Sequence, residues 1–154
     1  MTEDAAQPHI ASFMILRRGN KIAFVLRTHT TWMNGYYGLP SGKVKVNESF
    51  SAAAIREAQE EVGVKVDPKN LQFVHAAHRF SHDSDHQDWI DVYFEAKTWE
   101  GEPYNAEPTI HGELAWLDLN NLPENIVPPV RAALEQIANG HAYSEFDWPT
   151  TSAN

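Results

Sequence analysis

Three glutamates close together in one predicted helix are the residues best suited to chemistry. Glu57, Glu60 and Glu61 lie three and four positions apart in the stretch Ser49 to Glu61, which is rich in alanine and contains neither Gly nor Pro. Those offsets put the carboxylates on one helix face, with Cβ atoms about 5–6 Å apart. Like charges at that spacing destabilise a helix by about 0.2–0.5 kcal/mol per pair. A divalent cation such as Mg²⁺ offsets the repulsion, because carboxylate oxygens are its preferred ligands.

The glutamate spacing alone has a simpler explanation, a solvated acidic helix face, which is the commoner case. The surrounding residues change that weighting, because they resemble the Nudix box, a pattern of glycines, glutamates and an arginine at fixed spacing. The matching residues are Gly42, Glu48, Arg56, Glu57, Glu60, Glu61 and Gly63, with the aliphatic Val64 after them. Seven matches at about one in twenty each have a chance on the order of 10⁻⁹ per starting point.

The resemblance to the Nudix family implies a role for each box position. Glu57 and Glu61 are the implied main ligands of Mg²⁺ or Mn²⁺, and Glu60 is a further ligand or positions a bridging water. Arg56 is implied to orient the glutamates, because its planar fork suits carboxylates. The remaining implied positions are the structural Gly42, Glu48 and Gly63 and the metal-ligating main-chain carbonyl of Ser41.

Two positions depart from the family's pattern. The family usually has Gly-Gly after the proline, whereas Ser41 and Gly42 follow Pro40 here, and Ala58 stands where a larger aliphatic residue is usual. A carbonyl ligand survives the first change if Ser41 adopts the required backbone angles. The second change should weaken packing slightly and leave the chemistry alone.

The reaction implied by the resemblance is hydrolysis of a diphosphate linkage, in which a metal-activated water attacks phosphorus in line. The candidate bases for the water's proton are Glu60 and Glu61 within the box and Glu107 outside it. The alternative for Glu107 is an exposed loop residue without a role. The base therefore stays open between these three residues.

The segment from Gly101 to Pro123 resembles a segment of the family's nucleoside-triphosphate diphosphatases. That subgroup releases a nucleoside monophosphate and pyrophosphate, so a (d)NTP is the expected substrate. The first alternative is a nucleoside diphosphate derivative such as ADP-ribose or a nucleotide sugar. The second is a non-catalytic Nudix module that binds a nucleotide or a partner. Such modules usually lose box glutamates, and all of them are present here.

Candidate substrate contacts lie mainly on the loop from Thr28 to Pro40. Trp32 and Tyr37 are aromatic residues there, and stacking on a base is worth about 1–3 kcal/mol. Hydrophobic packing under the loop is an equally good explanation. For Trp116 a core position on a short strand is the favoured explanation. The weaker candidates for contact with phosphate or base are Arg27, His29 and Leu39.

A second polar cluster follows the predicted strand Leu71 to Ala77. His82 and His86 are four apart, a spacing that binds zinc when it is helical. The intervening Asp83 and Ser84 favour a turn instead. A polar loop near the substrate cleft is therefore favoured over a second metal site.

The elements that position these residues alternate between extended and helical patterns. Gly19 and Asn20 separate two β-rich runs and predict a hairpin. The predicted strands are Ile10 to Leu16, Lys21 to Arg27, Leu71 to Ala77, Trp89 to Ala96 and Leu114 to Leu117, and a second helix runs from Pro128 to Ala138. Together with the resemblance they predict one α+β domain over residues 1–154, an α/β/α sandwich with a mixed sheet. Its loose ends are expected at about residues 1–8 and 149–154.

Composition excludes several classes of protein and site. No cysteine is present among the 154 residues, which excludes a disulfide framework, a thiolate zinc site and a Cys nucleophile. A net charge of −9 argues against duplex nucleic acid as a partner. No apolar run approaches the roughly 20 residues needed to span a bilayer, and Met1 to His9 lacks a secretory signal. A cytoplasmic enzyme acting on a small nucleotide is expected, with a homodimer left open.

Overall fold

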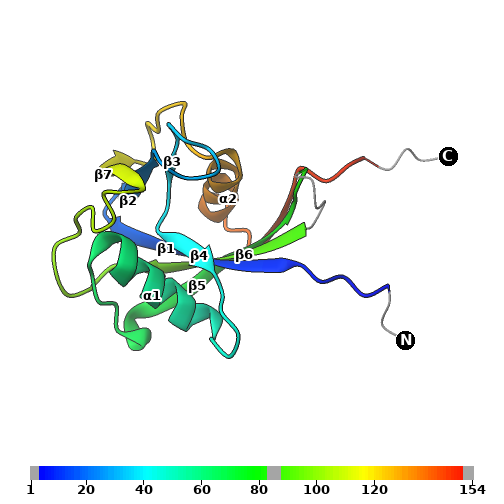
Figure 1. The fold of residues 1–154 in the computed structure, drawn as a ribbon, viewed down its shortest axis with the longest axis horizontal. Coiled ribbons are helices and arrows are strands. Elements are labelled where there is room, and N and C mark those ends of the chain that lie inside the picture. The colour runs from blue at the N-terminus through cyan, green and yellow to red at the C-terminus, as the bar shows by residue number, and fades with distance from the viewer. Residues whose placement is uncertain (1–3, 83–87, 151–154) are drawn as a thin grey trace.

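The computed structural model describes residues 4–82 and 88–150 of the chain. A mixed sheet of eight strands lies between two helices (Figure 1). Helix α1 (Phe50–Val62) covers one face of the sheet, and helix α2 (Pro128–Ala138) covers part of the other. The predicted α+β class and the α/β/α layering are therefore confirmed.

The sheet has the strand order β3-β2-β1-β6-β5-β8, with β4 added to β1 and β7 added to β2. Its pairs β1–β6 and β5–β8 are parallel and the others are antiparallel. The strands are β1 (His9–Arg18), β2 (Lys21–Arg27), β3 (Tyr37–Gly38), β4 (Ser41–Lys43), β5 (Leu71–Phe80), β6 (Asp88–Ala96), β7 (His111–Asp118) and β8 (Tyr143–Phe146). A short 3₁₀ helix, η1 (Pro68–Asn70), leads into β5.

The predicted hairpin is present only near its turn. β1 and β2 pair at two positions, Arg17 with Ile22 and Arg18 with Lys21, and then diverge. β1 continues in parallel with β6, while β2 pairs with β7. Consecutive residues of β1 are buried, from Met14 to Leu16, because both faces of this strand are covered. A run buried on both faces fits a parallel pairing in the middle of a sheet better than a hairpin arm.

Helix α1 is capped at both ends, by Ser49 at its start and by Gly63 at its end. The Ser49 side chain accepts a hydrogen bond from the Ala52 N–H, which caps the first turn. Gly63 ends the helix with φ 72°, and a side chain there would overlap the Tyr104 ring. The predicted helix Ser49 to Glu61 is therefore confirmed to within one residue at each end.

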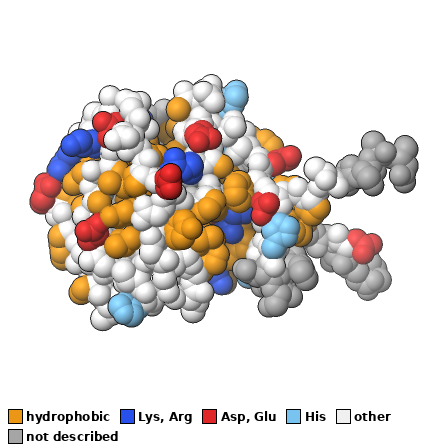
Figure 2. Space-filling view, turned by 90° about the horizontal axis from the view of Figure 1, so that it is seen from above, with side chains coloured by type: hydrophobic (Ala, Val, Ile, Leu, Met, Phe, Trp, Pro, Cys, Tyr) orange, Lys and Arg blue, Asp and Glu red, His pale blue; other side chains and the backbone are white. Residues whose placement is uncertain are grey.

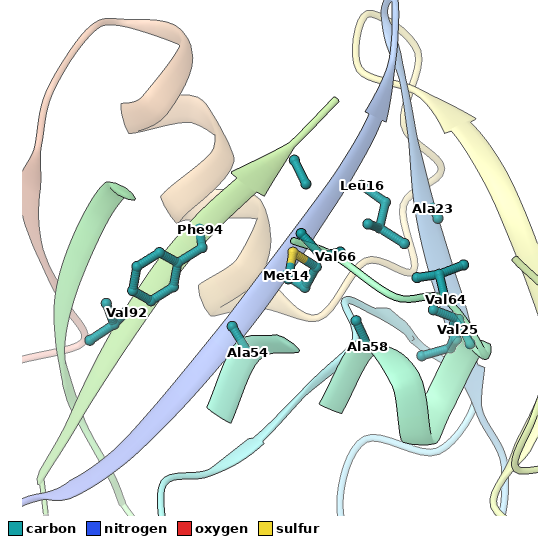
Figure 3. Close-up of a cluster of buried hydrophobic side chains, with 12 residues drawn as sticks. Met14, Leu16, Ala23, Val25, Ala54, Ala58, Val64, Val66, Val92 and Phe94 are labelled. Carbon is teal, nitrogen blue, oxygen red and sulfur yellow. The ribbon is translucent and has the colours of Figure 1, made fainter. Parts of the chain in front are cut away.

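The side of α1 that faces the sheet is lined by alanines. Ala54 and Ala58 are fully buried in the cluster shown in Figure 3, together with Met14 and Leu16 of β1 and Val92 of β6. Small side chains let the helix lie close to the sheet. Helix α1 is thereby held against β1 and β4, which sets the position of its glutamates.

Three short strands, β3, β4 and β8, were not predicted. β8 follows α2 and pairs in parallel with β5, far away in sequence. Its four residues are too few to show a clear alternation, and only the tertiary pairing makes it a strand. The expected loose ends lie partly outside the described residues, which begin at Asp4 and end at Thr150. Within the described part of the chain, neither helix has the length and hydropathy needed to cross a bilayer.

Candidate active site

The centre of the site is a network of ion pairs around Arg56. Its Nε and Nη2 donate to the two carboxylate oxygens of Glu48 at 2.7 and 2.9 Å. Its Nη1 donates to Glu57 at 2.7 Å and to Glu60 at 3.2 Å. Arg56 also reaches the main-chain carbonyl of Lys43 on β4 at 3.2 Å. One guanidinium thus holds three carboxylates and ties α1 to the strand beside it.

Glu61 is held differently and lies deeper. Its carboxylate accepts a hydrogen bond from the backbone N–H of Ser41 at 2.9 Å, and the residue is 8% exposed. Burial raises the pKa of Glu61 well above its ordinary range, and the charge of Glu57 raises it further. The contact with Ser41 is made by its N–H, so a ligand role for the Ser41 carbonyl stays a prediction.

A solvated acidic face, the simpler explanation of the glutamate spacing, does not describe two of the three glutamates. The side chain of Glu57 is 12% exposed and that of Glu60 is 49% exposed, while Glu61 is buried. Burial raises the pKa of Glu57, against the lowering effect of Arg56. The cause is β4, which packs across this side of α1 and was not predicted from the sequence.

Gly42 is the point of closest approach between β4 and α1. A Cβ atom at this position would overlap the carboxylate of Glu57. Gly42 pairs with Ser12 of β1, whose hydroxyl donates to the main-chain carbonyl of Phe50 at 2.8 Å. Strand β4 is therefore held in place by β1, and only a glycine at position 42 leaves room for the Glu57 carboxylate.

Glu107 joins the cluster from a loop that packs on the end of α1. The Ala106 N–H donates to the main-chain carbonyl of Glu61 at 3.0 Å. The main-chain carbonyl of Glu107 accepts the N–H groups of Ile110 and His111. Burial raises the pKa of Glu107, and the charge of Glu60 raises it further. Glu107 in turn raises the pKa of Glu57 and Glu61, so it is the fourth carboxylate of this cluster.

The donor set fits a hard divalent cation. The pKa values of Glu57, Glu61 and Glu107 are all raised by burial and by neighbouring carboxylates, with Arg56 and Arg27 as the positive charges beside them. Oxygen ligands are those that Mg²⁺ prefers, and Mg²⁺ keeps several waters rather than a closed protein cage. Among the described residues, no group of three acidic or histidine side chains is arranged to hold a metal ion. The reason is that Glu57 and Glu60 turn toward Arg56, whereas Glu61 turns toward Ser41.

Two candidate substrate residues lie together beside this cluster. Arg27 Nε donates to the main-chain carbonyl of Trp32 at 2.8 Å, and the Arg27 guanidinium lies 5.5 Å from the centre of the Trp32 ring. Burial lowers the pKa of Arg27, while the charge of Glu61 acts in the opposite direction. Arg27 thus links the acidic cluster to the ring of Trp32, which is 39% exposed.

The other four candidates lie elsewhere. Leu39 is 3% exposed in the core under α2, so its expected role as a substrate contact is corrected to packing. Trp116 of β7 packs against the core cluster and stacks on Trp99 at the opposite end of β1, which fits the favoured core position and not a place in the substrate pocket. The Tyr37 hydroxyl donates to Glu113, and exposed His29 contacts the Thr28 hydroxyl at 3.1 Å.

A group of residues that sequence reasoning missed lies on the α2 side of the sheet. Arg79 of β5 makes an ion pair with Asp91 of β6 and lies between two tryptophans, Trp32 and Trp89. From above, Figure 2 shows hydrophobic side chains together with basic and histidine side chains on this side of the molecule. The signal in the sequence was Asp91, a carboxylate inside the apolar run from Trp89 to Ala96.

The histidine cluster, for which a polar loop was favoured over a second metal site, lies only partly within the described residues. His82 makes an ion-pair contact with Asp147 at 3.0 Å, and His78 contacts Asp88 at 2.5 Å. His86, Asp83 and Asp85 lie outside the described residues. The zinc hypothesis for this loop therefore stays untested.

Comparison with known proteins decides the family. Residues 7–137 match the NUDIX domain family over most of the chain. This chain belongs to the Nudix family. A crystal structure of a MutT NUDIX hydrolase from Burkholderia pseudomallei superposes with a TM-score of 0.76 at 28% identity, covering 84% of this chain and 98% of that chain. The resemblance stated from the box residues is therefore confirmed.

Two curated relatives each match less than half of this Nudix chain. An 8-oxo-dGTP diphosphatase of Proteus vulgaris is 35% identical over 63 residues, which cover 41% of this chain and 56% of that protein. An NAD-capped RNA hydrolase, NudC, of Escherichia coli is 37% identical over 67 residues, covering 44% of this chain and 25% of that protein. The alignments thus span about half of the first relative and a quarter of the second.

Proposed function

We propose that this Nudix domain hydrolyses (d)NTPs to (d)NMPs and pyrophosphate with Mg²⁺ or Mn²⁺. The observation that carries the proposal is that Glu57 and Glu61 lie against β4, at Gly42 and Ser41, with the charge of Glu107 acting on both. A cluster of mutually repelling carboxylates is suited to a divalent cation and, through it, to a phosphate anion. In a chain of net charge −9, the cation supplies the attraction that the protein surface lacks.

Each residue of the cluster has a part in the proposal. Glu57 and Glu61 hold the cation, with Glu60 beside them at the exposed end of the cluster. Arg56 keeps Glu57 and Glu60 oriented, and it is itself fixed by both oxygens of Glu48. When bound, the cation neutralises phosphate oxygens and lowers the pKa of a bound water.

The proton of the attacking water needs a carboxylate acceptor in reach. Glu60, Glu61 and Glu107 are the candidates, and Glu107 differs from the others because it lies on a separate loop. The packing of that loop on the end of α1 brings Glu107 into the cluster without making it part of the helix. This position leaves Glu107 free to act on water while the helix glutamates hold the metal.

Two observations support a triphosphate as the substrate. One is the Gly101 to Pro123 segment, which contains Glu107 and resembles that of the family's triphosphate diphosphatases. The other is the likeness to the Proteus vulgaris protein named 8-oxo-dGTP diphosphatase. NudC, a relative with a similar level of identity, is named for a different substrate, so the products must be identified directly.

A panel of nucleotides tested with and without Mg²⁺ checks the proposal. We expect pyrophosphate and a nucleoside monophosphate from one or more (d)NTPs, and no turnover after chelation of the metal. Release of two monophosphates from ADP-ribose or a nucleotide sugar, with no pyrophosphate from any (d)NTP, would replace it with the alternative substrate class. Binding of nucleotides without turnover under all metal conditions would indicate a non-catalytic module.

A further inference from the structure

Arg79 is held rigidly by a carboxylate that has almost no contact with solvent. Its Nε and Nη2 donate to the two oxygens of Asp91 at 2.7 and 3.2 Å, and Asp91 is 1% exposed. Within residues 4–82 and 88–150, Nη1 of Arg79 makes no hydrogen bond. A buried pair of this kind fixes the orientation of a guanidinium and leaves its third nitrogen available to a ligand.

Two tryptophans lie on either side of this guanidinium. The Arg79 Cζ lies 4.9 Å from the centre of the Trp89 ring and 5.9 Å from that of Trp32. Trp32 in turn lies beside Arg27, and Trp89 lies 5.4 Å from the Lys43 ammonium. The charge of Glu61 acts on Arg27, so Trp32 leads back to the glutamate cluster through Arg27.

A cavity of about 300 Å³ opens beside Arg79 and Trp32. Phe146 of β8 contributes a further aromatic wall, and Asp147 contributes a carboxylate that contacts His82 at 3.0 Å. The cavity thus combines flat aromatic walls with a fixed donor and an acceptor. A planar heteroaromatic ring is the ligand that such walls accept, because every base has a face that can stack.

The donor and the acceptor favour one class of base over another. A guanidinium can only donate, and an ionised carboxylate can only accept. Guanine presents the O6 acceptor next to N–H donors, whereas adenine presents an amino donor where guanine has O6. Adenine in the same position would place donor against donor at Arg79.

We propose that Arg79 determines base specificity and selects 6-oxopurines, the class of guanine, with Asp147 accepting from the adjacent N–H groups. This inference rests on the proposed hydrolysis for its kinetic consequences but not for binding. The base lies in the cavity beside Trp32, and the phosphates extend past Arg27 to the glutamate cluster.

The first test is binding without turnover, using dGMP and dAMP in the absence of metal and measured by titration calorimetry. We expect dGMP to bind roughly 5- to 150-fold more tightly than dAMP, the range for one good base-edge contact. Equal affinities would overturn the inference. A wild-type protein that prefers dGMP yet hydrolyses no nucleotide would overturn the proposed function and leave this inference standing.

The second test compares kcat/KM for dGTP, dATP and ribose 5′-triphosphate in the double variant Arg79→Gln/Asp91→Asn. Removing both charges avoids a buried unpaired Asp91. Glutamine can both donate and accept, as adenine recognition requires. We expect the dGTP preference to be lost or reversed, with ribose 5′-triphosphate hydrolysed within about threefold of wild type, because it carries no base. The matched control is Arg17→Gln/Glu95→Gln, which removes another arginine–carboxylate pair of this sheet at 3.4 Å.

An unchanged dGTP preference in the double variant would overturn the inference, as would an equal loss for ribose 5′-triphosphate and dGTP. Where circular dichroism shows that the double variant is unfolded, Asp147→Asn decides. That side chain is 56% exposed, so its replacement does not threaten the fold. We expect Asp147→Asn to lower the ratio of dGTP to dATP turnover, and an unchanged ratio in that variant would overturn the inference.

Discussion

The glutamate cluster and the Arg79 cavity differ in their balance of positive and negative charge. In the glutamate cluster four carboxylates share two arginines, and neighbouring carboxylates raise the pKa values of Glu57, Glu61 and Glu107. Around Arg79 the single buried carboxylate, Asp91, is matched by one guanidinium. The first region is short of positive charge and suits a cation, whereas the second is balanced and suits a neutral ring. The difference separates the chemistry of phosphate from the recognition of a base.

This contrast has a kinetic consequence. Interactions with the reacting phosphate are strongest in the transition state, so substitutions among the glutamates should lower kcat. Contacts with a remote base bind substrate and transition state alike, so substitutions near Arg79 should mainly raise KM. Variants in each region therefore test whether the two regions differ in this way.

The largest effect is expected for Glu57→Gln. The change removes a metal ligand's charge, and we expect Mg²⁺-dependent pyrophosphate release to fall below about one hundredth of wild type. The melting temperature should be maintained or raised, because burial already disfavours the charged form of Glu57. Glu135→Gln, an exposed glutamate of α2, is the control and should be fully active. Full activity of Glu57→Gln would remove Glu57 from the metal site.

A smaller loss of activity is expected for Gly42→Ala. The added methyl group overlaps the Glu57 carboxylate, so the carboxylate must move away from its place beside Arg56. We expect kcat to fall about tenfold to a hundredfold, with destabilisation of about 1–3 kcal/mol from overpacking. Steady-state kinetics and thermal unfolding measure the two effects. In Gly38→Ala, the matched control, the new methyl group meets Val127 at an ordinary 3.6 Å and should be tolerated.

Trp32→Ala tests the Arg79 cavity. Loss of one stacking surface should raise KM for dGTP about tenfold while kcat stays within about threefold of wild type. Trp32→Phe keeps an aromatic face and should recover most of the affinity. The measurement is steady-state kinetics with dGTP. A fall in kcat like that expected for Glu57→Gln would place Trp32 with the glutamate cluster and remove the distinction between the two regions.

The smallest effect on turnover is expected for Glu48→Gln, whose signature is its pH dependence. The hydrogen bonds from Arg56 lower the pKa of Glu48 from 4.5 to about 2. A carboxyl group whose pKa is lower in the folded protein stabilises it above the unfolded pKa and loses that effect as the pH falls. We therefore expect wild type to melt higher than Glu48→Gln at pH 7, and the difference to vanish between about pH 4.5 and pH 2.

Thermal unfolding across that pH range checks this expectation. Glu102→Gln is the control, because Glu102 also receives two hydrogen bonds from one arginine but its side chain is 71% exposed. Exposed pairs of this kind contribute little to stability. A constant difference between wild type and Glu48→Gln over the whole range would mean that the charge of Glu48 does not support Arg56.

The box, its helix and the layered fold were determined by the sequence alone. The reason is that Glu57, Glu60 and Glu61 are neighbours through helix geometry, which acts over three and four residues. Ser49 and Gly63 mark the helix ends by capping, which is equally local. A family pattern carried by such residues can be recognised without knowing where any distant part of the chain lies.

Tertiary packing determines which distant residues lie beside these glutamates. The packing of a separate loop on the end of α1 brings Glu107 to the glutamates, and strand pairing puts Arg79 beside Trp89. Packing under α2 buries Leu39, and the pairing of β7 with β2 puts Trp116 beside Arg18 at the far end of β1. These placements depend on sheet register, in which a shift of one residue turns every side chain to the opposite face. Register is set by the whole sheet together, so no short stretch of sequence contains it.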